Sequence, residues 1–224
     1  MGKAKAGIIR NLMESTGGSF SKGLGINPRP SRPEEIFKWF LASVFFGARI
    51  SEKIAVQTFR VFNRQGVTSP KKILDRGWDG LVQLLDEGGY VRYDFKTATK
   101  LLEVAGALQS QYGGDLNRLH DMSSDPLDLE DRLRSLAKGV GKVTVNIFLR
   151  EIRGIWEKAE PLPGDLCIAA AKDLGLIRKN LRFEETILAE LKALWKDHGV
   201  PGKDFTDFEA ALVRQGIQYR REKH

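Results

Sequence analysis

The chain has 224 residues, of which 42% are hydrophobic, which is enough to bury one large core or two smaller ones. Its single cysteine, Cys167, excludes an internal disulfide and any four-cysteine zinc or iron–sulfur site. Because no apolar run reaches the roughly 20 residues that span a bilayer and no signal peptide opens the chain, we expect a cytoplasmic protein without a membrane partner. The net charge of +7 favours a polyanionic partner.

Much of this positive charge lies near the N-terminus. Residues 1–33 hold six basic residues against one acidic residue, Glu14. The same segment is rich in glycine and proline, a composition that favours a mobile arm over a packed element. We therefore predict a basic flexible arm over residues 1–30, which either contacts a polyanion such as DNA or is an ordinary disordered terminus.

The remaining sequence has helical periodicity and no period-two alternation, which predicts an all-α fold. Ser31 with Glu34, and Thr206 with Glu209, have the spacing of capping boxes. Prolines and capping residues mark helix starts, and glycine pairs mark helix ends. In the first half of the chain, we expect helices that begin at Pro33, at Ser51 and at Ser69-Pro70, a helix over residues 78–85, and a long helix between Gly88-Gly89 and Gly113-Gly114. In the second half, we expect helices that begin at Asp125-Pro126 and at Val143, followed by helices over residues 165–174, 183–195 and 208–217.

Two glycines separate two of these helices within residues 136–144 (LAKGVGKVT). Glycine lets the backbone turn sharply and approach another molecule, while the next helix directs unpaired N–H groups and the positive end of its dipole outward. Alone, the pattern is more often a plain turn between helices, but lysines and a hydroxyl beside it suit a phosphate. The candidate phosphate-binding residues are Lys138, Gly139, Val140, Gly141, Lys142 and Thr144.

The hairpin Gly139-Val140-Gly141 resembles the helix-hairpin-helix of the base-excision DNA glycosylases that include endonuclease III. That family also has a Gly/Pro-rich stretch ending in an aspartate at the start of the next helix, which residues 161–165 (PLPGD) match in the expected order. The resemblance extends weakly to Gly88-Gly89-Tyr90 and to residues 40–54, and covers roughly residues 37–174. It implies a two-lobed helical DNA glycosylase fold with a cleft between the lobes.

We expect a terminal lobe formed by residues 31–48 and 155–224, and a central lobe over residues 49–154 that ends in the hairpin. The partner implied by the resemblance is double-stranded DNA that contains a damaged or mispaired base. We expect a monomer in the cytoplasm, associated with the nucleoid.

The resemblance makes Asp165 the candidate catalytic residue. Cleaving a base–sugar bond builds positive charge on the deoxyribose, which a carboxylate stabilises while it orients an attacking water. By itself, an aspartate after a glycine is commonly a helix cap, so Asp165 is expected to have both roles. Relatives that also cut the backbone have a lysine where this chain has Val143, which predicts a monofunctional glycosylase. The alternatives are a bifunctional glycosylase and lyase, or a non-catalytic DNA-binding module.

Aromatic residues on the predicted helices are candidates for a base pocket, since a flipped base is held between flat apolar surfaces. Phe46 falls near the residue that relatives insert into the space left by the base. The family also implies a structural Na⁺ or K⁺ held by hairpin carbonyls, and the lone cysteine predicts no iron–sulfur cluster. The pocket or wedge candidates are Trp39, Phe45, Phe46 and Tyr90, and the carbonyls map to Ser135, Ala137 and Val140.

Overall fold

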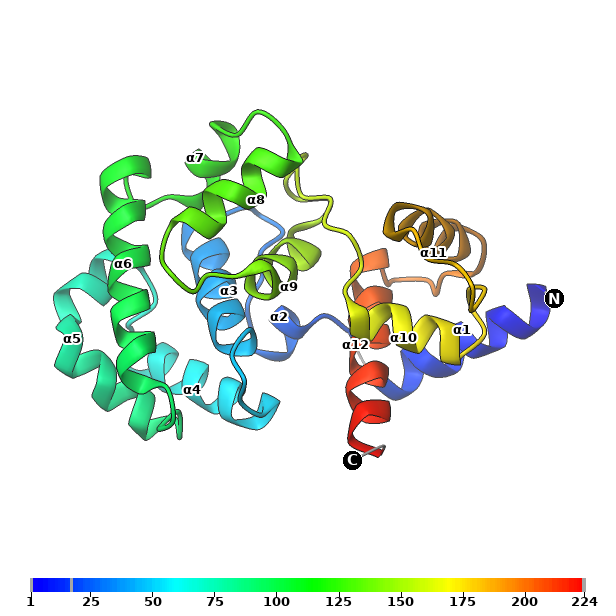
Figure 1. Cartoon of the computed structure of the whole chain (residues 1–224), viewed down its shortest axis with the longest axis horizontal. Coiled ribbons are helices and arrows are strands. Elements are labelled where there is room, and N and C mark those ends of the chain that lie inside the picture. The colour runs from blue at the N-terminus through cyan, green and yellow to red at the C-terminus, as the bar shows by residue number, and fades with distance from the viewer. Residues whose placement is uncertain (1, 17, 223–224) are drawn as a thin grey trace. The chain divides into compact units, whose positions relative to one another are not determined.

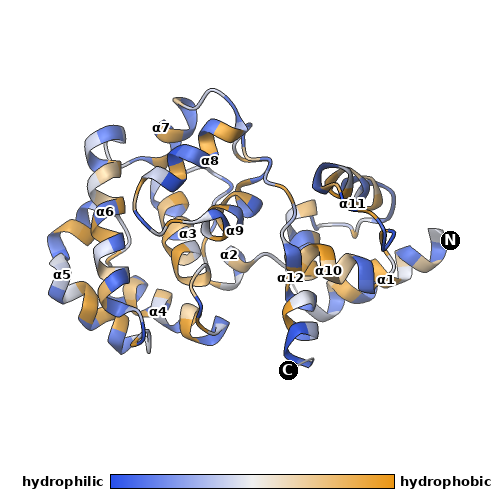
Figure 2. Ribbon diagram, in the orientation of Figure 1, coloured by the Kyte–Doolittle hydropathy of each residue, from blue (hydrophilic) through white to orange (hydrophobic). Residues whose placement is uncertain are grey.

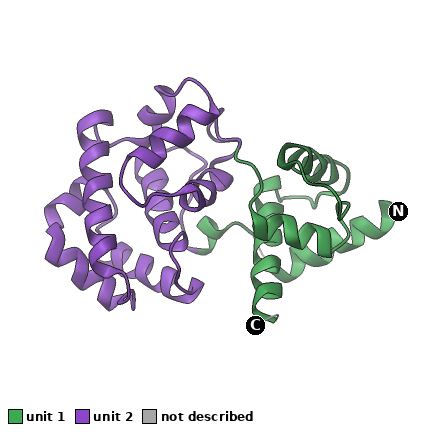
Figure 3. Ribbon diagram, viewed as in Figure 1, with its two compact units in different colours: residues 1–23, 161–224 green, residues 24–160 purple. Residues whose placement is uncertain are grey.

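The computed structural model describes residues 2–16 and 18–222, and the chain divides into two compact units (Figure 1, Figure 3). Unit 1 is built from the two ends of the chain, residues 1–23 and 161–224, and unit 2 from residues 24–160. The described residues form helices and turns without a strand; an isolated bridge joins Arg153 and Trp156. The predicted all-α fold is confirmed.

Unit 2 is organised around α3, which packs against α4, α7 and α9. Nine of the fourteen residues of α3 are buried, and most of the helix is hydrophobic in Figure 2. α5 and α6 pack against each other. The helices of unit 2 are α3 (Pro33–Phe46), α4 (Glu52–Arg64), α5 (Pro70–Glu87), α6 (Asp94–Tyr112), α7 (Leu116–Asp121), α8 (Pro126–Ser135) and α9 (Lys142–Ile152).

Several helix ends lie where the sequence predicts them. The side chains of Ser51 and Asp125 accept hydrogen bonds from the first turns of α4 and α8. Gly113, in the left-handed region with φ 63, ends α6. Gly77, with φ 70, interrupts the helical backbone of α5 and so divides it into the two predicted helices.

Neither predicted capping box forms. Arg32 is the N-cap of α3, while Ser31 has φ 53 and its hydroxyl donates to Asn117 Oδ1 at 2.8 Å. At α12 the Asp204 carboxylate accepts from the Asp207 N–H at 3.0 Å, so the helix begins earlier than predicted. At α3 the Ser31 hydroxyl is bonded to Asn117 and no side chain caps the helix, and at α12 Asp204 takes the place of the predicted Thr206. The spacing alone reveals neither partner.

Unit 1 is organised around α12, which packs against α1, α10 and α11. The rings of Trp195 on α11 and Phe208 on α12 stack with centroids 5.3 Å apart. No helix in the described ranges combines the length and apolarity needed to cross a membrane. The helices of unit 1 are α1 (Gly2–Thr16), α2 (Phe20–Gly23), α10 (Asp165–Asp173), α11 (Glu184–His198) and α12 (Phe205–Glu222).

The prediction of a flexible arm over residues 1–30 is wrong for the part that forms α1. This helix buries Ile9, Leu12 and Met13, whose spacing places them on one face, against α12. The Lys5 ammonium donates to the carbonyl of Leu176 at 2.7 Å. Glycine-rich composition suggested mobility, but packing of this short apolar stripe overrides it.

The unit boundaries also differ from the predicted lobes. Residues 31–48, expected in the terminal lobe, belong to unit 2 because α3 forms its core. Residues 155–160 belong there as well: the Trp156 ring contacts Phe148 edge to face, with centroids 5.4 Å apart. The second boundary therefore falls between residues 160 and 161.

Candidate functional site

The hairpin joins α8 to α9 through residues 136–141. Gly139 has φ 94, a backbone conformation that L side chains rarely adopt, and the Val140 N–H donates to the Ala137 carbonyl at 3.1 Å. Gly141 is the N-cap of α9 and has an extended backbone, with φ −94 and ψ 175. The two glycines thus have different tasks: the first makes the turn, and the second begins the helix.

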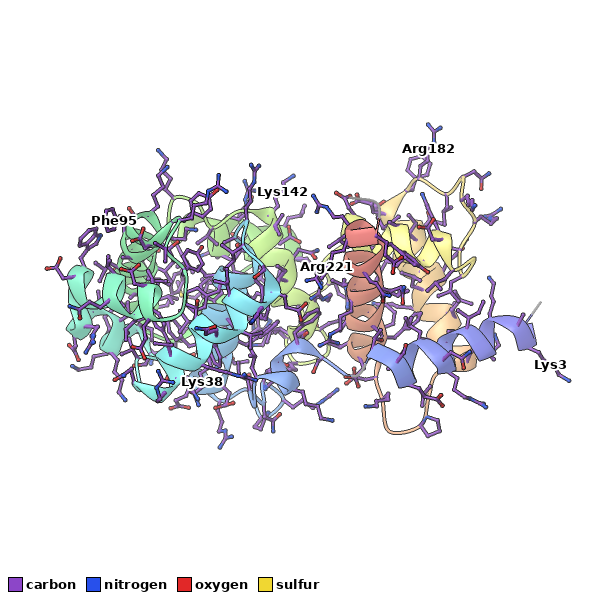
Figure 4. All side chains as sticks on the ribbon, turned by 90° about the horizontal axis from the view of Figure 1, so that it is seen from below. Lys3, Lys38, Phe95, Lys142, Arg182 and Arg221 are labelled. Atoms are coloured by element: carbon purple, nitrogen blue, oxygen red, sulfur yellow. The ribbon has the colours of Figure 1, made fainter. Side chains whose placement is uncertain are left out.

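The exposed surface of the hairpin is suited to an anion. Gly141 has no side chain to cap α9, so the N–H groups of the first turn have neither an intrahelical acceptor nor a side-chain cap. The first turn of α9 contains no acidic residue, and the adjoining Lys138 and Lys142 are exposed. Figure 4 shows the Lys142 side chain directed away from the ribbon of unit 2. This arrangement can bind a phosphate through backbone and side-chain donors together.

One carboxylate near this surface moderates its charge. Burial raises the pKa of Glu130 on α8, and the charge of Asp131 raises it further. The positive charges of Arg134 and Lys142 lower this pKa, so Glu130 is close enough to interact electrostatically with the first residue of α9. The positive potential at α9 is therefore reduced on the α8 side.

Two of the predicted phosphate-binding residues do not present their side chains to solvent. The Thr144 side chain is buried and faces Gly47, where an added Cβ would overlap its hydroxyl. The Val140 side chain is also buried, so only its backbone is available. The prediction for the Thr144 hydroxyl is wrong because this position of α9 lies on the face that packs against α3. Gly47, which has no Cβ to overlap the Thr144 hydroxyl, allows this close approach of α9.

Two residues of α6 that the sequence did not indicate hold the hairpin from the side. Glu103 Oε2 accepts a hydrogen bond from the Lys138 N–H at 3.2 Å. The end of the Lys100 side chain lies beside Gly139, its Cε 3.1 Å and its Nζ 3.6 Å from where a Cβ would stand. No local pattern marks either residue, because both contacts join segments more than 30 residues apart.

The expected cation ligands are carbonyl oxygens, which suit a hard cation such as Na⁺ or K⁺. Ser135 ends α8, so its carbonyl has no partner within the helix. The Ala137 carbonyl accepts one hydrogen bond, from Val140, and retains a second lone pair. This donor set fits a monovalent cation, and the assignment of Ser135, Ala137 and Val140 remains a prediction.

Asp165 is the first residue of α10, in unit 1, and is exposed. The predicted cap is wrong by one residue: Gly164, with φ −76 and ψ 165, is the N-cap, and no side chain caps this helix. Among the described residues, the Asp165 carboxylate has no hydrogen-bond or ion-pair partner. It therefore gains only the favourable interaction of an acidic group with a helix N-terminus and is free to contact a ligand.

The position of Asp165 depends on a close contact between α10 and α12. A Cβ added at Gly216 of α12 would stand 2.3 Å from the carbonyl oxygen of Leu166. Only glycine allows the two backbones to come this near. Cys167, Ala170 and Ala171 are buried on the same helix, so the small residues of α10 fix its first turn against unit 1.

Three of the four aromatic pocket candidates are core residues of unit 2. Trp39, Phe45 and Tyr90 are each no more than 1% exposed. The Trp39 indole N–H donates to the Phe148 carbonyl at 3.0 Å, which satisfies its polar atom internally. The structure does not support a pocket role for these three. Phe46 is half-buried and keeps some exposed surface, which leaves it the remaining wedge candidate.

The buried aromatic rings instead contact one another. Phe45 lies 5.2 Å from the Phe62 ring and 6.0 Å from the Tyr90 ring, measured between centroids. Thr97 Oγ1 donates to the Tyr90 hydroxyl at 3.2 Å. The sequence could not separate a pocket from a core here, because α3 is apolar on nearly every face.

No family model and no curated relative matches the sequence. The fold does match a solved structure: H. pylori 3-methyladenine DNA glycosylase (MagIII) bound to 1,N6-ethenoadenine. The match has a TM-score of 0.59 at 12% sequence identity and covers 98% of each chain. The chain therefore has the fold of a DNA glycosylase over essentially its whole length.

Proposed function

We propose that this protein is a DNA glycosylase of base-excision repair, which flips a damaged or mispaired base out of double-stranded DNA and hydrolyses its N-glycosidic bond. The observation that carries the proposal is the fold match, which spans 98% of both chains. The exposed carboxylate of Asp165 and the exposed glycine turn of the hairpin supply the two chemical groups that this reaction needs.

The hairpin would hold the DNA backbone. N–H groups of Gly141 and the first turn of α9 bind a phosphate oxygen, and the exposed ammonium groups of Lys138 and Lys142 add electrostatic affinity. These contacts carry no information about the base sequence, so they position the DNA without selecting a site. A Na⁺ or K⁺ bound to the hairpin carbonyls would add positive charge beside the phosphate.

Asp165 would act at the sugar. As the C1′–N bond breaks, its electron pair leaves with the base and positive charge develops on the deoxyribose. The carboxylate stabilises this charge and accepts a proton from the water whose oxygen bonds to C1′. The base leaves with the electron pair of the broken bond, and a proton from solvent neutralises its former glycosidic nitrogen where that nitrogen carries negative charge. The other product is an abasic sugar with a hydroxyl at C1′, and the proton accepted by Asp165 returns to solvent.

We infer that the enzyme has no lyase step. The second residue of α9, where relatives with lyase activity carry a lysine, is Val143, which is 63% exposed and has no amine. Lys142 is the preceding residue, and one residue along a helix turns a side chain by about 100°. The Lys142 amine therefore points in a different direction from the lysine of those relatives. Water is therefore the nucleophile, and a single protein chain acts on the duplex.

Strand cleavage after alkali tests the proposal. The substrates are duplexes with uracil, thymine opposite guanine, 8-oxoguanine, adenine opposite 8-oxoguanine, oxidised pyrimidines and, first, alkylated purines, because the similar structure is of a 3-methyladenine glycosylase. We expect breaks on at least one duplex only after alkali, and their loss in Asp165→Asn. Asp173→Asn changes an exposed aspartate at the other end of α10 and is the matched control. Breaks without alkali indicate a lyase, and binding without breaks indicates a non-catalytic module.

A further inference from the structure

Lys100 of α6 reaches the hairpin from outside the motif. The end of its side chain covers the turn at Gly139, and one helical turn further on Glu103 accepts the hydrogen bond from Lys138. Residues three apart on a helix lie on the same face, so one face of α6 supports the hairpin at two consecutive backbone positions. The stem of Lys100 is half-buried by this packing, whereas Lys138 and Lys142 are exposed at the same turn.

The charge of Lys100 is unfavourable in the free protein. The side chain is half-buried, and loss of hydration lowers the pKa of its ammonium. Within the described ranges it has no hydrogen bond or ion pair, and the Glu103 carboxylate on the same face of α6 accepts from the Lys138 N–H instead. If this side chain only filled space, methionine would stabilise the fold more, because it has a similar size and carries no charge.

Three lysines of the hairpin and its support lie within this part of unit 2. Lys138 and Lys142 belong to the turn, Lys100 lies beside it, and the N-terminus of α9 carries the positive end of its own dipole. The charge of Glu130 reaches Lys142 from the α8 side. An anion bound at this turn would interact favourably with these charges.

We propose that Lys100 is a third phosphate-binding lysine of the hairpin, whose ammonium contacts the DNA phosphate held by the first turn of α9. This inference rests on the proposed function. The half-buried stem of Lys100 restricts this side chain before DNA binds, so less side-chain entropy is lost on binding than for an exposed lysine. Glu103 is a positioning residue, because it holds the Lys138 backbone so that the turn faces the phosphate.

Salt-dependent binding of Lys100→Met to an undamaged duplex tests this assignment. Each phosphate contact contributes about 0.9 to the slope of log affinity against log salt concentration. We expect the slope to decrease in magnitude by about that amount, so that the binding defect is roughly 3.5-fold larger at 50 mM than at 200 mM salt. Lys96→Met removes the same charge from an exposed position one turn away on α6 and should change the slope by less than half as much. Lys100→Arg should restore it.

A purely structural role makes the opposite prediction for stability. We expect Lys100→Met to unfold at a temperature equal to or above that of the wild type while it binds DNA less tightly. In the wild-type protein, the NMR-measured pKa of Lys100 should rise when the duplex is added, and this does not depend on any variant folding. Equal slopes for the Lys100 and Lys96 variants, or a pKa that the duplex leaves unchanged, would overturn the assignment. If the wild type binds no duplex at all, the proposed function fails with it.

Discussion

Replacing each hairpin glycine by alanine separates the folding of the turn from its contact with DNA. At Gly139, with φ 94, a Cβ is strained and lies 3.1 Å from the end of Lys100. At Gly141 the backbone is extended, and an added Cβ would meet no atom within 4 Å. The two substitutions add the same methyl group two residues apart, but only one of them strains the fold.

The expected sizes follow from these conformations. A non-glycine residue held in such a region costs roughly 1–3 kcal/mol, and the flexible end of Lys100 can move by a few tenths of an ångström at little further cost. With a urea dependence of about 2 kcal/mol/M, the midpoint of unfolding falls by about 0.5–1.5 M for Gly139→Ala. An unstrained surface change stays within about 0.5 kcal/mol, or about 0.25 M, for Gly141→Ala.

We expect Gly141→Ala, which leaves stability unchanged, to weaken DNA binding. The Gly141 methyl group stands at the start of α9, where a phosphate would approach the N–H groups, so this variant loses duplex affinity while its stability is unchanged. The measurements are urea unfolding followed by tryptophan fluorescence, and duplex titration at fixed salt. Equal midpoints for the two variants, or wild-type affinity in Gly141→Ala, would refute the roles given to the two glycines.

Three further predictions concern other parts of the molecule. Gly216→Ala should destabilise unit 1 and slow base release, because its Cβ would overlap the Leu166 carbonyl. Gly106→Ala lies in a helix with free space around it, so this variant should be more stable by up to about 1 kcal/mol. Thermal unfolding of both variants checks the two expectations. Borohydride should trap no covalent adduct with an abasic duplex; an adduct lost in Lys142→Met would contradict a monofunctional enzyme. Burial lowers the pKa of Lys100 in the folded protein, so the charged ammonium reduces the free energy of unfolding at neutral pH. This cost disappears as the pH rises from the folded-state pKa to the unfolded-state pKa, because the group then loses its proton. The stability advantage of Lys100→Met should therefore shrink towards pH 10.5, and an advantage constant with pH would be inconsistent with this cause.

The sequence predicted the parts of the structure that depend on local backbone chemistry. The turn at Gly139, the caps at Ser51 and Asp125, and the left-handed end of α6 at Gly113 each need a particular residue type at a particular place. Such requirements act over a few residues and are visible in a single sequence. The all-α fold and the exposed hairpin follow from the same local information.

The remaining features depend on contacts between distant segments. Thr144 is at the predicted place in the hairpin, but its exposure is decided by α3, about 100 residues earlier. Trp39 is an aromatic residue of the kind that lines base pockets, yet its ring is buried and its indole N–H donates to the Phe148 carbonyl. α1 forms because α12 covers its apolar stripe of Ile9, Leu12 and Met13, which by itself is too short to predict a packed helix in a segment rich in glycine and proline. Which segment packs against such a residue or stripe is not shown by the local sequence.

Release of the free base under single-turnover conditions tests the central claim most directly. With excess enzyme and the duplex on which the wild type gives alkali-dependent breaks, chromatography should detect the intact free base from the wild type and from Asp173→Asn. Loss of a group that stabilises transition-state charge costs about 100-fold or more, so Asp165→Asn should release base at least that much more slowly while it binds the duplex normally. Release by Asp165→Asn at the wild-type rate would contradict the catalytic role of this carboxylate.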